Sequence, residues 1–86
     1  MEIDQVIKFP LSTEKSIRLM EAENKLIFVV DKRADKKEIK EAIEKTFKVK
    51  VTKVNSLVTS KGQKRAYVRF ADENPAIDVA TQLGLM

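Results

Sequence analysis

Leu26 to Val30 is apolar at every position and forms the clearest pattern along the chain. A strand with one buried face alternates apolar and polar residues, so a continuous apolar run indicates a strand covered on both faces. We therefore expect an interior strand, with helices on both sides of its sheet. A shorter strand is expected before it, from Val6 to Leu11, where Pro10 limits its length.

Two further strands are expected later in the chain. In Val49 to Thr59 the apolar positions change phase near Thr52-Lys53, which indicates a β-bulge or a strand with both faces partly buried. Gly62 suits the positive φ of a turn over residues 60–63. The returning strand, Lys64 to Ala71, alternates cleanly between an apolar face of Ala66, Val68 and Phe70 and a polar face of Arg65, Tyr67 and Arg69.

Capping residues and helical spacing predict three helices between and after these strands. Glu14 lies in the first turn of the first helix, Asn24 ends that helix, and Gly84 ends the last. The expected caps are Ser12 or Thr13, then Asp35 with Glu38 as a capping box, then Asn74 followed by Pro75. The expected buried stripes are Ile17 with Met20 and Ala22, then Ile39, Ala42, Ile43 and Phe47, then Ile77, Ala80 and Leu83.

The elements follow the order β-α-β-α-β-β-α. The second helix serves as a crossover and the last two strands form a hairpin, so the simplest arrangement inserts the final strand between the second and the third. The sequence thus predicts an α+β fold of ferredoxin-like type, with a four-stranded antiparallel sheet in the order 1-2-4-3. With 86 residues and no repeat or linker, we expect one domain over residues 1–86.

Composition excludes several classes of function. The chain has no Cys, His or Trp and two Gly, so it lacks a Cys/His metal site, a His- or Cys-dependent nucleophile and a Gly-rich phosphate motif. Turns and caps explain acidic residues such as Asp31 and Asp35. We expect no enzymatic activity, no metal and no cofactor. The apolar runs are too short to insert into a membrane, and the acidic start of the chain lacks a signal-peptide core, so an intracellular protein is expected.

Charge is distributed unevenly along the sequence. The net charge of +4 comes from 17 basic and 13 acidic residues. Lys45 to Ala71 holds eight of the basic residues and none of the acidic ones. A positive field confined to one part of a protein indicates a polyanionic partner.

The polar face of the last strand supplies chemistry for such a partner. Arg65 and Arg69 can pair with phosphates, and the Tyr67 ring between them can stack on a base or a ribose. These residues lie on a strand rather than on a recognition helix, and a single outward aromatic residue does not suit base-by-base readout. We therefore expect recognition of the shape and backbone of a folded RNA. The face is extended by either Lys50 and Thr52 or Lys53 and Asn55 on the neighbouring strand, and by Lys61, Gly62 and Lys64 at the turn.

Five ordered segments of the chain also match a known family. They are Pro10 to Ser16, Ala34 to Glu44, Phe47 to Val51 with Val54 to Ser56, Lys64 to Phe70, and Ala76 to Ala80. Through them the chain resembles, over its whole length, the large-subunit ribosomal protein twenty-three family, and most closely its archaeal type. The resemblance implies a structural constituent of the cytoplasmic ribosome that binds the third domain of large-subunit rRNA near the peptide exit tunnel.

The resemblance also implies partners and contact residues. Neighbouring ribosomal proteins are expected, as are exit-site factors such as the signal recognition particle or the translocon. Glu14 matches the docking carboxylate of bacterial relatives, and we assign Glu14 and Arg18 to docking; stabilisation of the first helical turn is the other interpretation of Glu14. The expected rRNA-contacting residues are Lys8, Thr13, Lys15, Lys50, Lys53, Asn55, Lys61, Gly62, Lys64, Arg65, Tyr67 and Arg69.

One feature departs from the bacterial pattern. Bacterial members carry a long basic loop between the last two strands, whereas this chain has residues 60–63 there. A second hypothesis stays open from the sequence, namely a stand-alone protein-interaction module whose basic hairpin meets an acidic protein. The salt dependence of RNA binding distinguishes these two functions.

Overall fold

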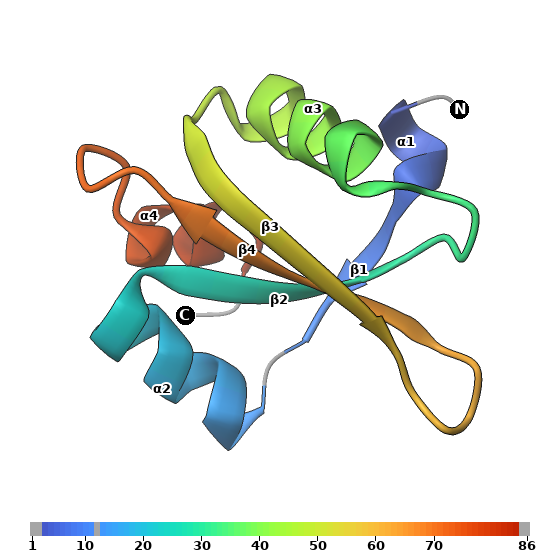
Figure 1. Cartoon of the computed structure of the whole chain (residues 1–86). Coiled ribbons are helices and arrows are strands. Elements are labelled where there is room, and N and C mark those ends of the chain that lie inside the picture. The colour runs from blue at the N-terminus through green and yellow to red at the C-terminus, as the bar shows by residue number, and fades with distance from the viewer. Residues whose placement is uncertain (1–2, 12, 85–86) are drawn as a thin grey trace.

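The computed structural model describes residues 3–11 and 13–84, and within them it has an α+β fold with one four-stranded antiparallel sheet (Figure 1). The sheet order is β1-β2-β4-β3, which confirms the predicted order. The strands are β1 Ile7–Pro10, β2 Lys25–Val30, β3 Val51–Val58 and β4 Lys64–Phe70. The helices are α1 Ile3–Val6, α2 Glu14–Glu23, α3 Lys36–Phe47 and α4 Ala76–Gln82.

Helix α1 is an element that the sequence pattern did not predict. Val6 was expected to begin a strand, but it ends this single helical turn and strand β1 starts at Ile7. The Val6 side chain is buried in the core, at 1% exposure. A single apolar position satisfies a strand and a helical turn equally well, so the pattern placed this boundary wrongly.

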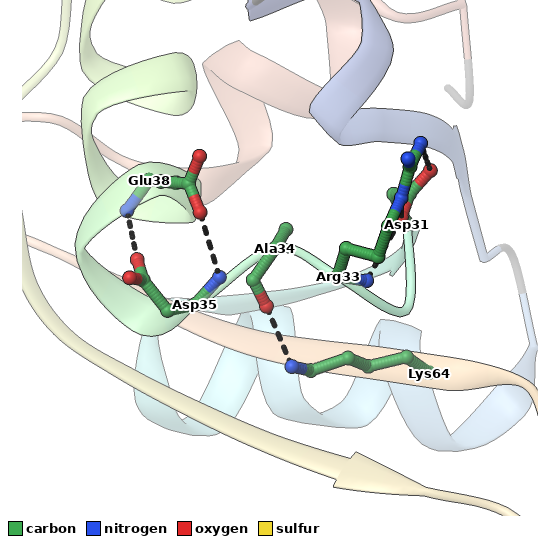
Figure 2. A network of polar contacts seen from close by, with 6 residues as sticks. All are labelled: Asp31, Arg33, Ala34, Asp35, Glu38 and Lys64. Carbon is green, nitrogen blue, oxygen red and sulfur yellow. Dashed lines mark hydrogen bonds and ion pairs between the residues drawn. The ribbon is translucent and has the colours of Figure 1, made fainter. Parts of the chain in front are cut away.

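Strand β2 is buried on both faces, as its continuous apolar run predicted. Leu26, Phe28 and Val30 join the main core, to which α3 contributes Ile39, Ala42 and Ile43. Ile27 and Val29 lie on the other face and are each 2% exposed. Helix α2 lies on the opposite side of the sheet from α1 and α3 (Figures 1 and 2). Helices therefore cover both sides of the sheet.

The β3–β4 hairpin contains the predicted irregularity. Val51 pairs with Phe70 and Lys53 pairs with Arg69, so Thr52 is one extra residue in β3. Its hydroxyl donates a hydrogen bond to the Arg69 carbonyl oxygen at 3.3 Å. This bulge restores the inward orientation of Val54 after Val51, and both are buried.

The caps of α2 and α3 form as predicted. The Thr13 hydroxyl accepts from the Ser16 amide at 3.2 Å, whereas Ser12 lies outside the described residues. In α3, the Asp35 carboxylate accepts from the Glu38 amide at 2.7 Å and the Asp35 amide donates to the Glu38 carboxylate at 3.3 Å (Figure 2). Each helix thus begins at the residue that its capping sequence indicates.

The predicted cap of α4 is wrong. Pro75, not Asn74, occupies the N-cap position, and the Asn74 side chain instead accepts from the Lys50 amide at 2.8 Å. The Ala76 amide donates to the side-chain oxygen of Asn24, 52 residues earlier, at 2.6 Å. A cap supplied from so far away has no local sequence signature.

Two predicted buried stripes also need correction. Ile17 and Ile77 are 42% and 47% exposed, and Ala22 is exposed as well. Met20 and Ala80 are buried as predicted, and Leu83 packs partly buried against the core. In place of the exposed residues, α2 buries Ser16 and α4 buries Ala76 and Val79. Short helices present too few turns for spacing alone to identify the buried face. In the longer α3, Ile39, Ala42 and Ile43 are buried as predicted, and the partly buried Phe47 ring lies 6.3 Å from Phe28.

Candidate nucleic-acid interface

The outward side of the β3–β4 hairpin carries a set of side chains that we call the hairpin face. Residues directly opposite one another in an antiparallel pair point to the same side of the sheet. Lys53 lies opposite Arg69 and Asn55 lies opposite Tyr67. The structure therefore selects Lys53 and Asn55 over the alternative of Lys50 and Thr52. The hairpin face comprises Lys53, Asn55, Leu57, Arg65, Tyr67 and Arg69.

Lys53 and Arg69 place two positive charges directly across from each other, and both side chains are exposed. Like charges in this position destabilise a sheet, typically by a few tenths of a kcal/mol to about 1 kcal/mol. No acidic residue occurs from Lys45 to Ala71. On β2, Lys25 lies opposite Arg69 and is paired with Glu23 at 3.2 Å. An anion that bridges Lys53 and Arg69 converts this repulsion into attraction.

Helix α2 borders the same face. The Lys15 ammonium lies 5.6 Å from the centre of the half-buried Tyr67 ring, within the range of a cation–π contact. Thr13, the N-cap residue two positions before Lys15, is also exposed. Arg65 is oriented at the other end of the face, because its Nε donates to the Gln63 side-chain oxygen at 2.9 Å. The face thus has a defined centre and a positive charge at each side.

Five predicted contact residues lie elsewhere. Lys64 points to the other side of the sheet, where its ammonium donates to the Ala34 carbonyl oxygen at 2.6 Å (Figure 2). Lys8 is exposed on β1, at the far edge of the sheet, and Lys50 is exposed just before β3. Lys61 lies at the hairpin tip, next to Gly62, whose φ is 79°. Gly62 therefore serves the turn as predicted.

The two predicted docking residues lie on α2. Glu14 and Arg18 are exposed and one helical turn apart. The capping box of this helix uses Thr13 and Ser16, so Glu14 takes no part in it. In the described part of the chain, the Glu14 carboxylate has no recorded hydrogen bond or ion pair, which leaves its charge available beside the exposed Ile17.

Sequence reasoning attributed Asp31 to a turn, but it missed Lys32 and the bond between Asp31 and Arg33. Asp31 accepts from the Arg33 side chain at 3.2 Å and from the Arg33 amide at 2.8 Å (Figure 2). These bonds from Arg33 lower the pKa of the Asp31 carboxyl below its ordinary value. The Lys32 ammonium lies close to Gly62, across the space between the turn and the hairpin tip. Neither feature has a period or a motif that would reveal it in the sequence.

Among residues 3–11 and 13–84, no three acidic side chains come together as a metal site. Over the same residues, no helix has the length and apolar character needed to cross a membrane.

The fold and the hairpin face together define a small α+β protein with an open, positively charged sheet surface. Residues 5–78 match the family model of ribosomal protein L23. The chain is 45% identical over 85 residues to the large ribosomal subunit protein uL23 of Methanococcus aeolicus, and the alignment covers 99% of each chain. The chain therefore belongs to the ribosomal protein L23 family, as the five segments predicted. Membership assigns it to the cytoplasmic ribosome, in a family whose role is structural.

Proposed function

We propose that this chain is a constituent of the large ribosomal subunit that uses its hairpin face to bind the third domain of large-subunit rRNA near the peptide exit tunnel. The observation that carries the proposal is the Lys53–Arg69 pair, two exposed cations directly opposite each other. Such a pair costs stability in the free protein and gains it when a phosphate lies between the two charges.

The surroundings of Tyr67 favour contact with the RNA backbone over stacking on bases. Lys15 already lies over this ring, and the ring is half-buried. A cation held there can pair with a phosphate, whereas a base would have to displace it. We therefore infer recognition of RNA shape through phosphates.

A double variant, Lys53→Gln with Arg69→Gln, tests this function. Loss of two charge-assisted hydrogen bonds, each about 1.5–3 kcal/mol, is expected to weaken binding to a third-domain transcript by at least about 100-fold. The free energy of unfolding stays unchanged or rises slightly, because the repulsion is removed.

The matched control is Lys40→Gln with Lys45→Gln, which removes the same charge from exposed positions on α3, across the sheet from the hairpin face. Binding by the control should stay close to that of the unmodified chain. If both variants lose the same affinity for the transcript, the loss reflects net charge alone, and the hairpin face is rejected as the RNA-binding surface. Preferential binding to an acidic polypeptide over RNA would favour the protein-interaction function.

We further propose that Glu14 and Arg18 form part of a docking surface for exit-site factors. The support is the exposed position of both side chains beside Ile17, an apolar residue that is 42% exposed. Glu14→Ala should leave the affinity for rRNA unchanged and weaken the binding of signal recognition particle to ribosomes that carry the variant. Unchanged affinity for that particle would remove Glu14 from the docking surface.

A further inference from the structure

A hollow of about 280 Å³ lies between β1, the β2–α3 turn and the hairpin tip. It is large enough for about nine water molecules at their liquid volume. Three segments that are distant in sequence meet there, and each contributes lysine. We call this space the lysine hollow; the lysines that line it are Lys8, Lys32, Lys61 and Lys64.

The hairpin tip and the β2–α3 turn lie close together. The ammonium of Lys32 would lie 3.1 Å from a Cβ atom placed on Gly62, so the glycine leaves the space that this cation occupies. Lys64 is oriented as well, since its ammonium donates to the Ala34 carbonyl oxygen at 2.6 Å (Figure 2). The fold thus holds Lys64 in place, whereas Lys32 is exposed beside the glycine.

No carboxylate is among the described residues that line this hollow. Asp31 lies close enough to Lys8 for their charges to interact, but its carboxylate is bonded to Arg33 at 3.2 Å. In the described part of the chain, no recorded hydrogen bond or ion pair engages the side chains of Lys8, Lys32 or Lys61. The hollow therefore collects positive charge that an anion can balance.

A second hollow, of about 550 Å³, lies on the other side of the hairpin tip. It shares Lys61 and Gln63 with the first hollow and is also lined by Arg65. Gln63 holds Arg65 by a hydrogen bond of 2.9 Å. Positive charge therefore continues around the tip from the lysine hollow to the hairpin face. Such a path fits a chain of phosphates better than one isolated ion.

We propose that the lysine hollow holds a backbone phosphate of the same RNA that binds the hairpin face, with Lys32 and Lys61 as its principal contacts; this inference rests on the proposed function. A phosphodiester is favoured over free phosphate because the Gly62 amide already donates to the Thr59 carbonyl oxygen at 2.9 Å. The glycine amide is thus not available to enclose a small anion, and flexible ammonium groups suit a phosphate that the rest of the RNA holds in place.

The test uses the full chain and the variant Lys32→Gln with Lys61→Gln. Binding to the third-domain transcript is measured across a salt series, and inorganic pyrophosphate at constant ionic strength serves as the free-anion probe. The slope of log affinity against log salt should become shallower by about one, because the variant no longer neutralises the one phosphate in the hollow. Lys32→Arg, which keeps the charge, should restore the contribution of that position. All variants should keep the melting temperature of the unmodified chain.

The control is again Lys40→Gln with Lys45→Gln, which should leave the slope unchanged. An unchanged slope in the hollow variant overturns the inference, and a simultaneous loss of pyrophosphate binding would assign the hollow to free phosphate compounds instead. If Lys53→Gln with Arg69→Gln still weakens RNA binding in that case, the proposed function stands without the hollow. If neither variant affects binding to RNA, both proposals fail.

Discussion

Asn24 is predicted to be one of the most sensitive residues outside the apolar core. It ends α2 in the left-handed region, with φ 56°. Its side-chain nitrogen lies within hydrogen-bond distance of the carbonyl oxygens of Phe70, Ala71 and Asn74, at 3.1, 3.2 and 3.3 Å. Its side-chain oxygen accepts from the Ala76 amide at 2.6 Å. One side chain therefore joins α2 to the end of β4 and to the start of α4.

The cost of Asn24→Ala can be estimated from these contacts. Alanine in the left-handed region costs about 1–2 kcal/mol. The amide of the fully buried Ala76 would lose its partner, at about 1–3 kcal/mol. The side-chain nitrogen has two hydrogens and so makes about two effective bonds, each worth about 0.5–1.5 kcal/mol. The three contributions sum to about 3–8 kcal/mol, and a loss of about 4 kcal/mol, in the lower half of this range, is already a large share of the stability of a domain of this size.

Urea and thermal unfolding measure this loss. A decrease near 4 kcal/mol corresponds to a melting temperature that falls by roughly 15–30 °C. Asn24→Gly loses the same hydrogen bonds but no left-handed strain, so it should be about 1–2 kcal/mol more stable than Asn24→Ala. A loss below about 1 kcal/mol in Asn24→Ala would refute the role assigned to this side chain.

Two further predictions concern the β2–α3 turn and the hairpin tip. Arg33→Gln should raise the pKa of the Asp31 carboxyl toward its ordinary value, and NMR titration of that carboxyl group measures the change. Because the pKa is lowered in the folded state, the Asp31–Arg33 pair stabilises the fold at neutral pH. This stabilisation is lost as the pH falls through the folded pKa. An unchanged titration would contradict the Asp31–Arg33 bond. Gly62→Ala should destabilise the hairpin by about 1–2 kcal/mol in thermal unfolding, because φ at this position is 79°, in the left-handed region. Gly62→Asn should lose less stability than Gly62→Ala, because Asn tolerates the left-handed region better. If the two variants are equally stable, backbone strain at residue 62 does not explain the loss.

The sheet could be predicted because its signals are local and periodic. The apolar run of β2, the alternation of β4 and the phase change at Thr52 each depend on neighbouring residues. The Asp35–Glu38 capping box is local as well. These features located the strands and the start of α3, and the rules for short connections between them then gave the strand order.

The missed features depend on contacts between distant segments. Asn24 caps α4 from 52 residues away, which displaced the predicted role of Asn74. In the candidate site, alternation correctly placed Arg65 and Arg69 on one face, and it also places Lys64 on the opposite side of the sheet. The charge-based prediction grouped Lys64 with them because charge along a sequence carries no direction. Lys32 joins its hollow only when the turn folds against the hairpin tip.

Binding of the full chain to a third-domain rRNA transcript across a salt series tests the central claim most directly. If about five to eight phosphates are neutralised, log affinity should fall with log salt at a slope of roughly −4 to −7. Unrelated structured RNA of the same length should bind more weakly at every salt concentration. Weak binding that does not distinguish the two RNAs would contradict the claim, because it would leave a basic surface without a specific RNA partner.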